Sequence, residues 1–383
     1  MFVYVTILLF LLALWLFLKP KLALQISMLT AYALCSLRYD FGNYIHYKWN
    51  FVTIQRLGLL EIIGEYETFG DILSHNNSAY AEFGYIFLNW LFSWTSFEWF
   101  VAATTGLLFL TVYHLLVRYG EEEYYWLSFL VFVNPTILFV HLSVFRQMIA
   151  ACMLIWAVIV HLEVKFFWRR TLIELVLLLM MVLQHKSAIL LLPLFPFLDR
   201  IKLRGLFITY CLLWLIIPLA EPLLVNVSVN LGFYDTYTHS ERIRGGSIGS
   251  LALSMVLSVI FAWVVYFGQN ISDPTKRMLL ILYCFVFMTR PFNSRPTLYL
   301  FNRYELYFDL FAVIAIPMVI KQITSRFSRF VWTSVLIAFF LLRAYLFFLS
   351  PIAIGQHEFL YTSIFEKGIV IEQNWIKGYW FED

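Results

Sequence analysis

The sequence has little charge for its length, and this scarcity excludes several common classes of protein. Only 13% of its 383 residues are Asp, Glu, Lys or Arg, whereas 62% are hydrophobic. Soluble globular domains carry about 25% charged residues. The lysines and arginines form no extended basic stripe, which argues against a nucleic-acid-binding surface. We therefore expect a membrane protein without nucleic acid as a partner.

Metal-binding and redox motifs are missing as well. The four cysteines lie in or beside apolar runs and have no metal-ligand spacing, so we interpret them as small hydrophobic residues. There is no Asp-x-Asp pair to hold a metal at a phosphate and no Walker loop. We expect a site that uses neither metal nor cofactor.

Long apolar runs follow one another, and many approach the about 20 residues that an α-helix needs to cross a bilayer. Because an α-helix satisfies its own backbone hydrogen bonds in lipid, the pattern predicts an all-α polytopic membrane protein of a single domain, 1–383. The runs that predict about twelve transmembrane helices are 2–18, 22–37, 99–117, 124–143, 147–164, 172–184, 187–198, 206–220, 250–268, 278–290, 298–320 and 330–350.

Basic residues gather in the short connections between these runs, which the positive-inside rule places in the cytoplasm. Three longer stretches, 38–98, 221–250 and 351–383, then lie outside, as do both termini. The segment 83–94 is too short to span, so we expect a re-entrant or interfacial helix there. The stretch 171–198 should cross out and back.

This topology brings ionisable residues from several parts of the chain to the outer face of the membrane. Such residues cost about 2.5–3.5 kcal/mol each in hydrocarbon and usually face a functional cavity. The set comprises Arg38, Asp40, Glu82, Arg146, His185, Lys186, Arg290, Arg295 and Arg303.

Three arginines are candidates for binding a phosphate, since a guanidinium has a permanent charge and paired donors. Arg146 lies within the apolar stretch 132–162, where the alternative is snorkelling to the surface. For Arg303 the alternative is neutralisation by Glu305 and Asp309, which lie nearby in the sequence. Arg290 stands in a short polar turn, where simple solvation is the alternative.

Three other residues are candidates for proton transfer. His185 is either a structural turn residue or a base, and the charge of neighbouring Lys186 favours the neutral imidazole that a base requires. Asp40 and Glu82 are each either ion-paired or available as carboxylates. The aromatic residues around Tyr44 either line a sugar site or belong to the interfacial belt common in membrane proteins.

Five stretches, in this order, resemble the EpsG family of Wzy-like exopolysaccharide and O-antigen polymerases. They are RYDFGNY (38–44), EFGYIFLNW (82–90), FRQMIAA (145–151), QHKSAIL (184–190) and NRYELY (302–307). Two positions depart from the family pattern: Asn43 stands where an acidic residue is usual, and Phe83 replaces a proline. The first departure shifts the expected carboxylate role to Asp40.

The resemblance implies a GT-C-like glycosyltransferase of the bacterial inner membrane, with its active site facing the periplasm or the cell exterior. It would move a growing glycan from undecaprenyl pyrophosphate to the non-reducing end of a lipid-linked repeat unit. Membrane lipid and a chain-length regulator are the other expected partners.

On this basis we predict a role for each candidate. Either His185 or Asp40 would deprotonate the acceptor hydroxyl, with Glu82 as the third catalytic residue. The expected pyrophosphate-binding residues are Arg146, Arg303 and Arg290. The expected substrate-positioning residues are Arg38, Tyr44, Gln147, Lys186 and Tyr304.

Two other functions fit part of the pattern. An O-antigen ligase would share the donor and the arginines, but its large outer loop comes late in the chain, whereas the longest one here comes early. A flippase or transporter for the lipid-linked unit would show pseudo-symmetric halves with broken helices, and the sequence shows no such duplication.

Overall fold

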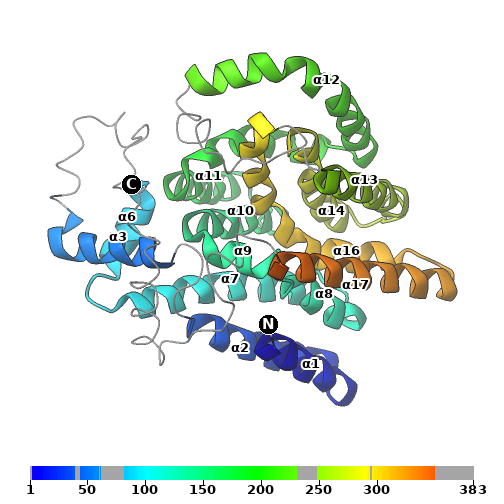
Figure 1. Ribbon diagram of the computed structural model, residues 1–383, viewed down its shortest axis with the longest axis horizontal. Helices are drawn as coiled ribbons and strands as arrows, with labels where there is room; N and C mark the ends of the chain where they lie inside the picture. The colour runs from blue at the N-terminus through cyan, green and yellow to red at the C-terminus, as the bar shows by residue number, and fades with distance from the viewer. Residues whose placement is uncertain are drawn as a thin grey trace. The chain divides into compact units, whose positions relative to one another are not determined.

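The computed structural model describes residues 2–38, 44–59, 61, 82–230, 248–293 and 296–349, which form α- and 3-10 helices without a strand among them (Figure 1). The all-α prediction is confirmed. The elements are α1 Phe2–Phe17, α2 Pro20–Ser36, α3 Tyr44–Leu57, α6 Phe83–Leu91, α7 Phe97–Tyr119, η1 Glu122–Tyr124, α8 Tyr125–Phe132, α9 Leu138–Ser143, α10 Phe145–Glu163, α11 Phe167–Gln184, η2 Lys186–Arg200, α12 Leu203–Asn230, α13 Ile248–Gly268, α14 Pro274–Met288, α15 Arg290–Asn293, η3 Pro296–Tyr307, η4 Asp309–Phe311, α16 Ala312–Lys321 and α17 Arg326–Leu349.

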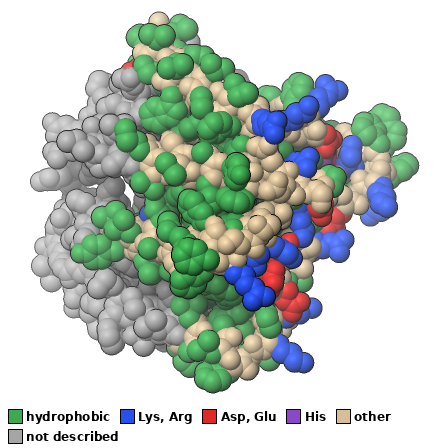
Figure 2. Space-filling view, turned by 90° about the vertical axis from the view of Figure 1, so that its right-hand side faces the viewer, with side chains coloured by type: hydrophobic (Ala, Val, Ile, Leu, Met, Phe, Trp, Pro, Cys, Tyr) green, Lys and Arg blue, Asp and Glu red, His purple; other side chains and the backbone are tan. Residues whose placement is uncertain are grey.

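Among the described residues, four helices are long and apolar enough to cross a membrane: α7, α10, α12 and α17. In α12 and α17 only 11% of the apolar window is buried inside the protein. Figure 2 shows hydrophobic side chains over broad areas of the surface. Exposed apolar surface on this scale marks a membrane protein, while the number of about twelve crossings stays a prediction.

The predicted apolar run 124–143 is not one helix, which corrects the expectation. α8 ends before Asn134 and Pro135, and α9 begins after them. Proline has no N–H to donate and disfavours helical conformation in the residue before it. The Asn134 side chain accepts hydrogen bonds from the N–H and Oγ1 of Thr136, at 3.1 and 2.7 Å, and donates to the carbonyl of Phe340 at 2.9 Å. These bonds hold the break in place.

The stretch 171–198 contains helices of two kinds. α11 ends at Gln184, and the second arm is the 3-10 helix η2, which contains Pro193 and Pro196. A 3-10 helix rises about 2.0 Å per residue, so its 15 residues reach about 30 Å. The expectation that this stretch crosses out and back stays a prediction.

The chain divides into two compact units, 1–117 with 122–189 and 336–383, and 118–121 with 190–335. In the first unit α10 and α11 pack along each other (Figure 1), and the short connection 164–166 makes them antiparallel neighbours. Ala150 and Ala151 are fully buried in α10, and small residues let helices approach closely. The start of α10 therefore lies beside the end of α11. The single domain stays a prediction.

The opposite ends of α10 and α11 carry a separate polar cluster. Nδ1 of His161, near the end of α10, hydrogen-bonds Oε1 of Glu174 at 2.9 Å. Nε of Arg170 lies 3.8 Å from the same oxygen. This cluster lies at the end of the helix pair opposite to Arg146 and His185.

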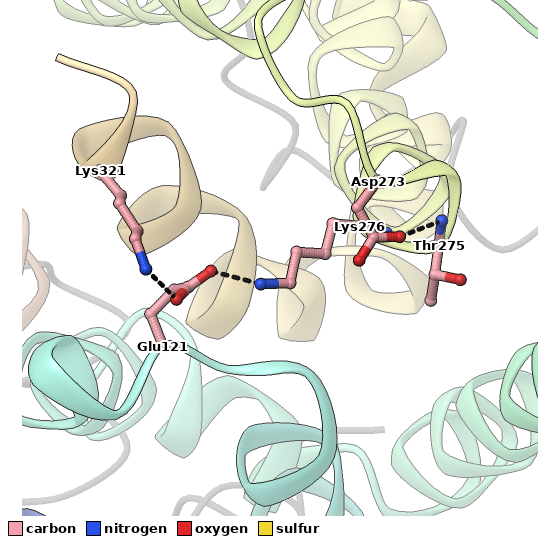
Figure 3. A network of polar contacts seen from close by, with 5 residues as sticks. All are labelled: Glu121, Asp273, Thr275, Lys276 and Lys321. Carbon is pink, nitrogen blue, oxygen red and sulfur yellow. Dashed lines mark hydrogen bonds and ion pairs between the residues drawn. The ribbon is translucent and has the colours of Figure 1, made fainter. Parts of the chain in front are cut away.

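In the second unit, Glu121 joins the ends of two helices (Figure 3). Its Oε1 accepts a hydrogen bond from Nζ of Lys276 at 2.5 Å, and its Oε2 accepts one from Nζ of Lys321 at 2.6 Å. Beside them, the carboxylate of Asp273 caps α14 by accepting from the backbone N–H of Thr275 at 2.9 Å. The start of α14 and the end of α16 are thereby held together.

Candidate functional site

His185 directly follows α11, which ends at Gln184. Its backbone is extended, with φ −154° and ψ 109°, while its N–H still bonds the carbonyl of Met181 at 3.1 Å. The side chain is 12% exposed. The imidazole is therefore held at a turn between two helices, α11 and η2, and is mostly shielded from solvent.

Glu82 directly precedes the short helix α6. Its carbonyl accepts hydrogen bonds from the N–H groups of Tyr85 and Ile86, at 2.9 and 3.1 Å, so the helix starts at this residue. A carboxylate at a helix N-terminus is stabilised by the helix dipole. The Glu82 side chain is 13% exposed, which makes its partners energetically important.

The carboxylate of Glu82 binds two other predicted site residues. Its Oε1 accepts a hydrogen bond from Nδ1 of His185 at 2.9 Å. Its Oε2 forms an ion pair with Nη1 of Arg146, the second residue of α10. These three side chains, Glu82, Arg146 and His185, form what we call the Glu82 cluster.

A close approach of two backbones makes this cluster possible. A Cβ added at Gly84 would lie 2.8 Å from the carbonyl carbon and oxygen of Leu183 and 3.0 Å from the nitrogen of Gln184. Only glycine therefore lets α6 pack this tightly against the last turn of α11. Glu82 and His185 each lie within two residues of this contact.

The charge state of Glu82 follows from its surroundings. Burial raises the pKa of this carboxyl, but the hydrogen bond from His185 and the charge of Arg146 outweigh it and lower the pKa to about 2. An ionised carboxylate only accepts hydrogen bonds, so Nδ1 of His185 must donate. In the neutral ring Nε2 then carries the lone pair, and no described residue hydrogen-bonds it.

Arg146 is the most exposed member of the cluster, at 30% of its side chain. Tyr47, from α3, is a second hydrogen-bond partner of its guanidinium. An arginine has five N–H donors, so these two contacts leave donors for an anionic ligand. Tyr47 was not among the predicted site residues, because one tyrosine in an aromatic-rich stretch has no distinguishing sequence signal.

The predicted positioning residues of the first unit occupy different environments. Tyr44 and Gln147 are buried, with 1% and 3% exposed, and the ring of Tyr44 packs edge-on against Phe97 with centroids 5.0 Å apart. Lys186 is half-buried and begins η2, next to His185. Of these three, Lys186 has the exposure that a substrate contact requires.

Arg38 is buried, with its guanidinium bound to protein groups. Nη1 donates to the carbonyl of Cys35 at 2.5 Å and to Oγ1 of Thr105 at 2.8 Å. Asp40, the alternative base and the expected partner of Arg38, lies outside the described residues.

In the second unit, Arg290 is 7% exposed and forms an ion pair with Glu305. Simple solvation of Arg290 is thus contradicted, and Glu305 is already engaged by Arg290. Arg303 is exposed, and the ring of Tyr304 lies 6.1 Å from that of Phe301. The pyrophosphate-binding roles of Arg290 and Arg303, and the positioning role of Tyr304, stay predictions.

The chain was also compared with known proteins. Neither the curated proteins nor the solved structures contain a match to it. The model of the EpsG family, however, matches residues 21–363, a span that includes every member of the Glu82 cluster. The chain belongs to the EpsG family.

Proposed function

We propose that this protein is a polysaccharide polymerase that joins lipid-linked repeat units at the outer face of the bacterial inner membrane. The growing glycan leaves undecaprenyl pyrophosphate and is attached to the non-reducing end of a new unit. Family membership supports a polymerase-type role on a lipid-linked oligosaccharide. The Glu82 cluster supplies the chemical groups that such a transfer needs.

In this proposal His185 is the general base. Nε2 takes the proton of the acceptor hydroxyl while the hydroxyl oxygen forms a bond to the anomeric carbon of the donor. Glu82 holds the imidazole through Nδ1 and stabilises the imidazolium that forms, as a carboxylate does for the histidine of a catalytic triad.

The bond from the anomeric carbon to the pyrophosphate oxygen breaks as the new bond forms, and its electron pair leaves with the pyrophosphate. Arg146 and Lys186, the cations beside His185, stabilise this developing charge. Because Glu82 pairs with one edge of the Arg146 guanidinium, that guanidinium is oriented before the substrate arrives. The reaction needs no metal in this scheme.

The observation that carries the proposal is the hydrogen bond from Nδ1 of His185 to Glu82, 2.9 Å long. It assigns the donor role to Nδ1 and leaves the basic nitrogen, Nε2, without a partner among the described residues. Nε2 can therefore accept the proton of a hydroxyl group, as a general base must.

The test uses the full-length protein in nanodiscs with its lipid-linked repeat unit and EDTA. We expect a ladder of longer glycans on a gel from the parent protein and none from His185→Ala or Arg146→Ala. The matched control is His161→Ala, which removes a histidine bonded to a glutamate at the same distance, 2.9 Å, at the other ends of α10 and α11. We expect the ladder to persist in this control.

Each alternative outcome is informative. A ladder that disappears with EDTA would contradict the metal-free scheme. Equal loss of the ladder in His161→Ala and His185→Ala would show that both substitutions act by destabilising the protein, which would contradict a catalytic role for His185. No ladder from a folded parent protein that binds the substrate would contradict polymerisation, and lipid translocation would then be measured.

A further inference from the structure

The guanidinium of Arg38 joins three helices of the first unit. Besides the carbonyl of Cys35 in α2 and Oγ1 of Thr105 in α7, it reaches the carbonyl of Leu142 in α9, 3.4 Å from Nη2. The residue is only 5% exposed. Such burial is unusual for an arginine, and here Nη1 and Nη2 make these three hydrogen bonds.

Two of these acceptors are carbonyls in the last turn of a helix. The carbonyls of Cys35 and Leu142 stand at the ends of α2 and α9, where backbone acceptors have no partner within their own helix. The partial negative charge of a helix C-terminus also favours a cation. A planar guanidinium reaches both carbonyls at once, whereas the single ammonium of lysine lacks this fork.

A series of contacts leads from Arg38 to the Glu82 cluster. Its guanidinium carbon lies 5.1 Å from the ring centroid of Phe145, the first residue of α10. The rings of Phe145 and Tyr47 have centroids 4.9 Å apart, and Tyr47 hydrogen-bonds Arg146. A change at Arg38 therefore reaches the site through protein contacts.

From this geometry we infer that Arg38 is a positioning residue: it holds the junction between α9 and α10 so that Arg146 meets Glu82. It acts without touching glycan or pyrophosphate, which replaces the direct substrate role expected from the sequence. The effect on catalysis rests on the proposed function, whereas the effect on the junction does not.

The first measurement is hydrogen exchange by mass spectrometry on the full-length protein in nanodiscs, comparing Arg38→Lys with the parent. Met148 is the reporter, because its N–H makes the first hydrogen bond of α10, to the carbonyl of Val144 at 2.9 Å. We expect the amides 148–151 to exchange about 10-fold faster in the variant, since local opening becomes easier.

The second measurement is the turnover of the glycan ladder. A misplaced Arg146 should lower turnover by about 100-fold and leave the KM for the lipid-linked substrate unchanged. The double variant that combines Arg38→Lys with Phe145→Leu should lose less turnover than the product of the two single fold-losses. Both substitutions act through one contact. Arg170→Lys, in the first unit but at the other end of α11, is the control and should alter neither measurement.

Opposite results would overturn the inference. Unchanged exchange together with a raised KM would show that Arg38 contacts the substrate. If the fold-losses of turnover multiply in the double variant, Arg38 and Phe145 act separately. Should Arg38→Lys not fold, Thr105→Val removes a single contact and gives the same comparison. If the folded parent makes no ladder, the proposed function fails, and the exchange result alone decides the role of Arg38.

Discussion

Nδ1 of His185 and Oε1 of Glu82 lie 2.9 Å apart, although 103 residues separate them along the chain. Neither side chain is more than 13% exposed. Because so little solvent reaches them, each side chain depends on the other for a hydrogen bond. The following predictions test this dependence and the packing that creates it.

Replacing the carboxylate by an amide, Glu82→Gln, should lower turnover by about 10²–10⁴-fold. The amide keeps the size of the side chain but no longer stabilises an imidazolium. The rate of ladder growth at saturating substrate is the measurement, and Glu82→Asp, which keeps the charge, should retain more activity than Glu82→Gln. Equal turnover in Glu82→Gln and the parent would contradict a catalytic role for Glu82.

The stability of the folded protein should depend on pH through the ionisation of Glu82. Its pKa is lowered from 4.5 to about 2 in the folded protein, so the unfolded chain binds a proton more readily. The stabilisation is therefore present in full above about pH 5 and is lost as the pH falls toward 2. We expect the melting temperatures of the parent and Glu82→Gln to differ by a constant amount at neutral pH and to converge at acidic pH. If the two melting temperatures differ by the same amount down to the lowest pH, the ionised carboxylate of Glu82 does not stabilise the fold.

Gly84→Ala should separate α6 from α11. Its Cβ meets backbone atoms of Leu183 and Gln184, which cannot move aside as a flexible side chain would. We expect a loss of about 1–3 kcal/mol in the free energy of unfolding and loss of the ladder, because Glu82 shifts away from His185.

Gly205→Ala is the matched control for this substitution. Gly205 lies in α12 and has no atom within 4 Å of an added Cβ. We expect it to be neutral or to stabilise the protein by about 0.4–1 kcal/mol, with the ladder unchanged. Similar losses in both variants would show that the close approach at Gly84 is not the cause.

Glu121→Gln tests a contact away from the Glu82 cluster. Burial raises the pKa of Glu121, but the hydrogen bonds from Lys276 and Lys321 outweigh it and lower the pKa below its ordinary value. The two lysine side chains are 31% and 44% exposed, so solvent screens the pair. We expect the free energy of unfolding to fall by about 0.5–1 kcal/mol. This loss should be smaller in high salt, and thermal unfolding measures it. A loss of turnover as large as that in Glu82→Gln would show that this contact is not independent of the Glu82 cluster.

The helical class and the members of the Glu82 cluster were predictable from the sequence for one physical reason. Charged and polar residues are costly within long apolar runs, so Arg146 and His185 stand out, and Glu82 appears beside a segment too short to span. Which carboxylate would meet His185 was not predictable. That pairing depends on the contact of Gly84 with α11, and hydrophobic periodicity contains no information about such a contact.

The environment of Arg38 shows the same limit. Its place two residues before Asp40 suggests a residue of the substrate site, yet its acceptors are backbone carbonyls of α2 and α9 and a threonine of α7. Only the carbonyls of the last turn lack a partner within their own helix. The break after α8, which creates the short helix α9, lies at Asn134 and Pro135, within a run that is apolar for most of its length.

The charged clusters at both ends of α10 and α11 have a consequence for the bilayer. From Arg146 to His161 the helix advances fifteen residues, about 23 Å along its axis at 1.5 Å per residue. Bilayer hydrocarbon is about 30 Å thick, so the two charged clusters lie closer together than the hydrocarbon is thick. Where this pair crosses the bilayer as the topology predicts, the surrounding lipid would have to thin, or the helices would have to gather partners, at a cost that rises with each ångström of mismatch. The acyl-chain length of the surrounding lipid thereby becomes a factor in how firmly the Glu82 cluster is held together.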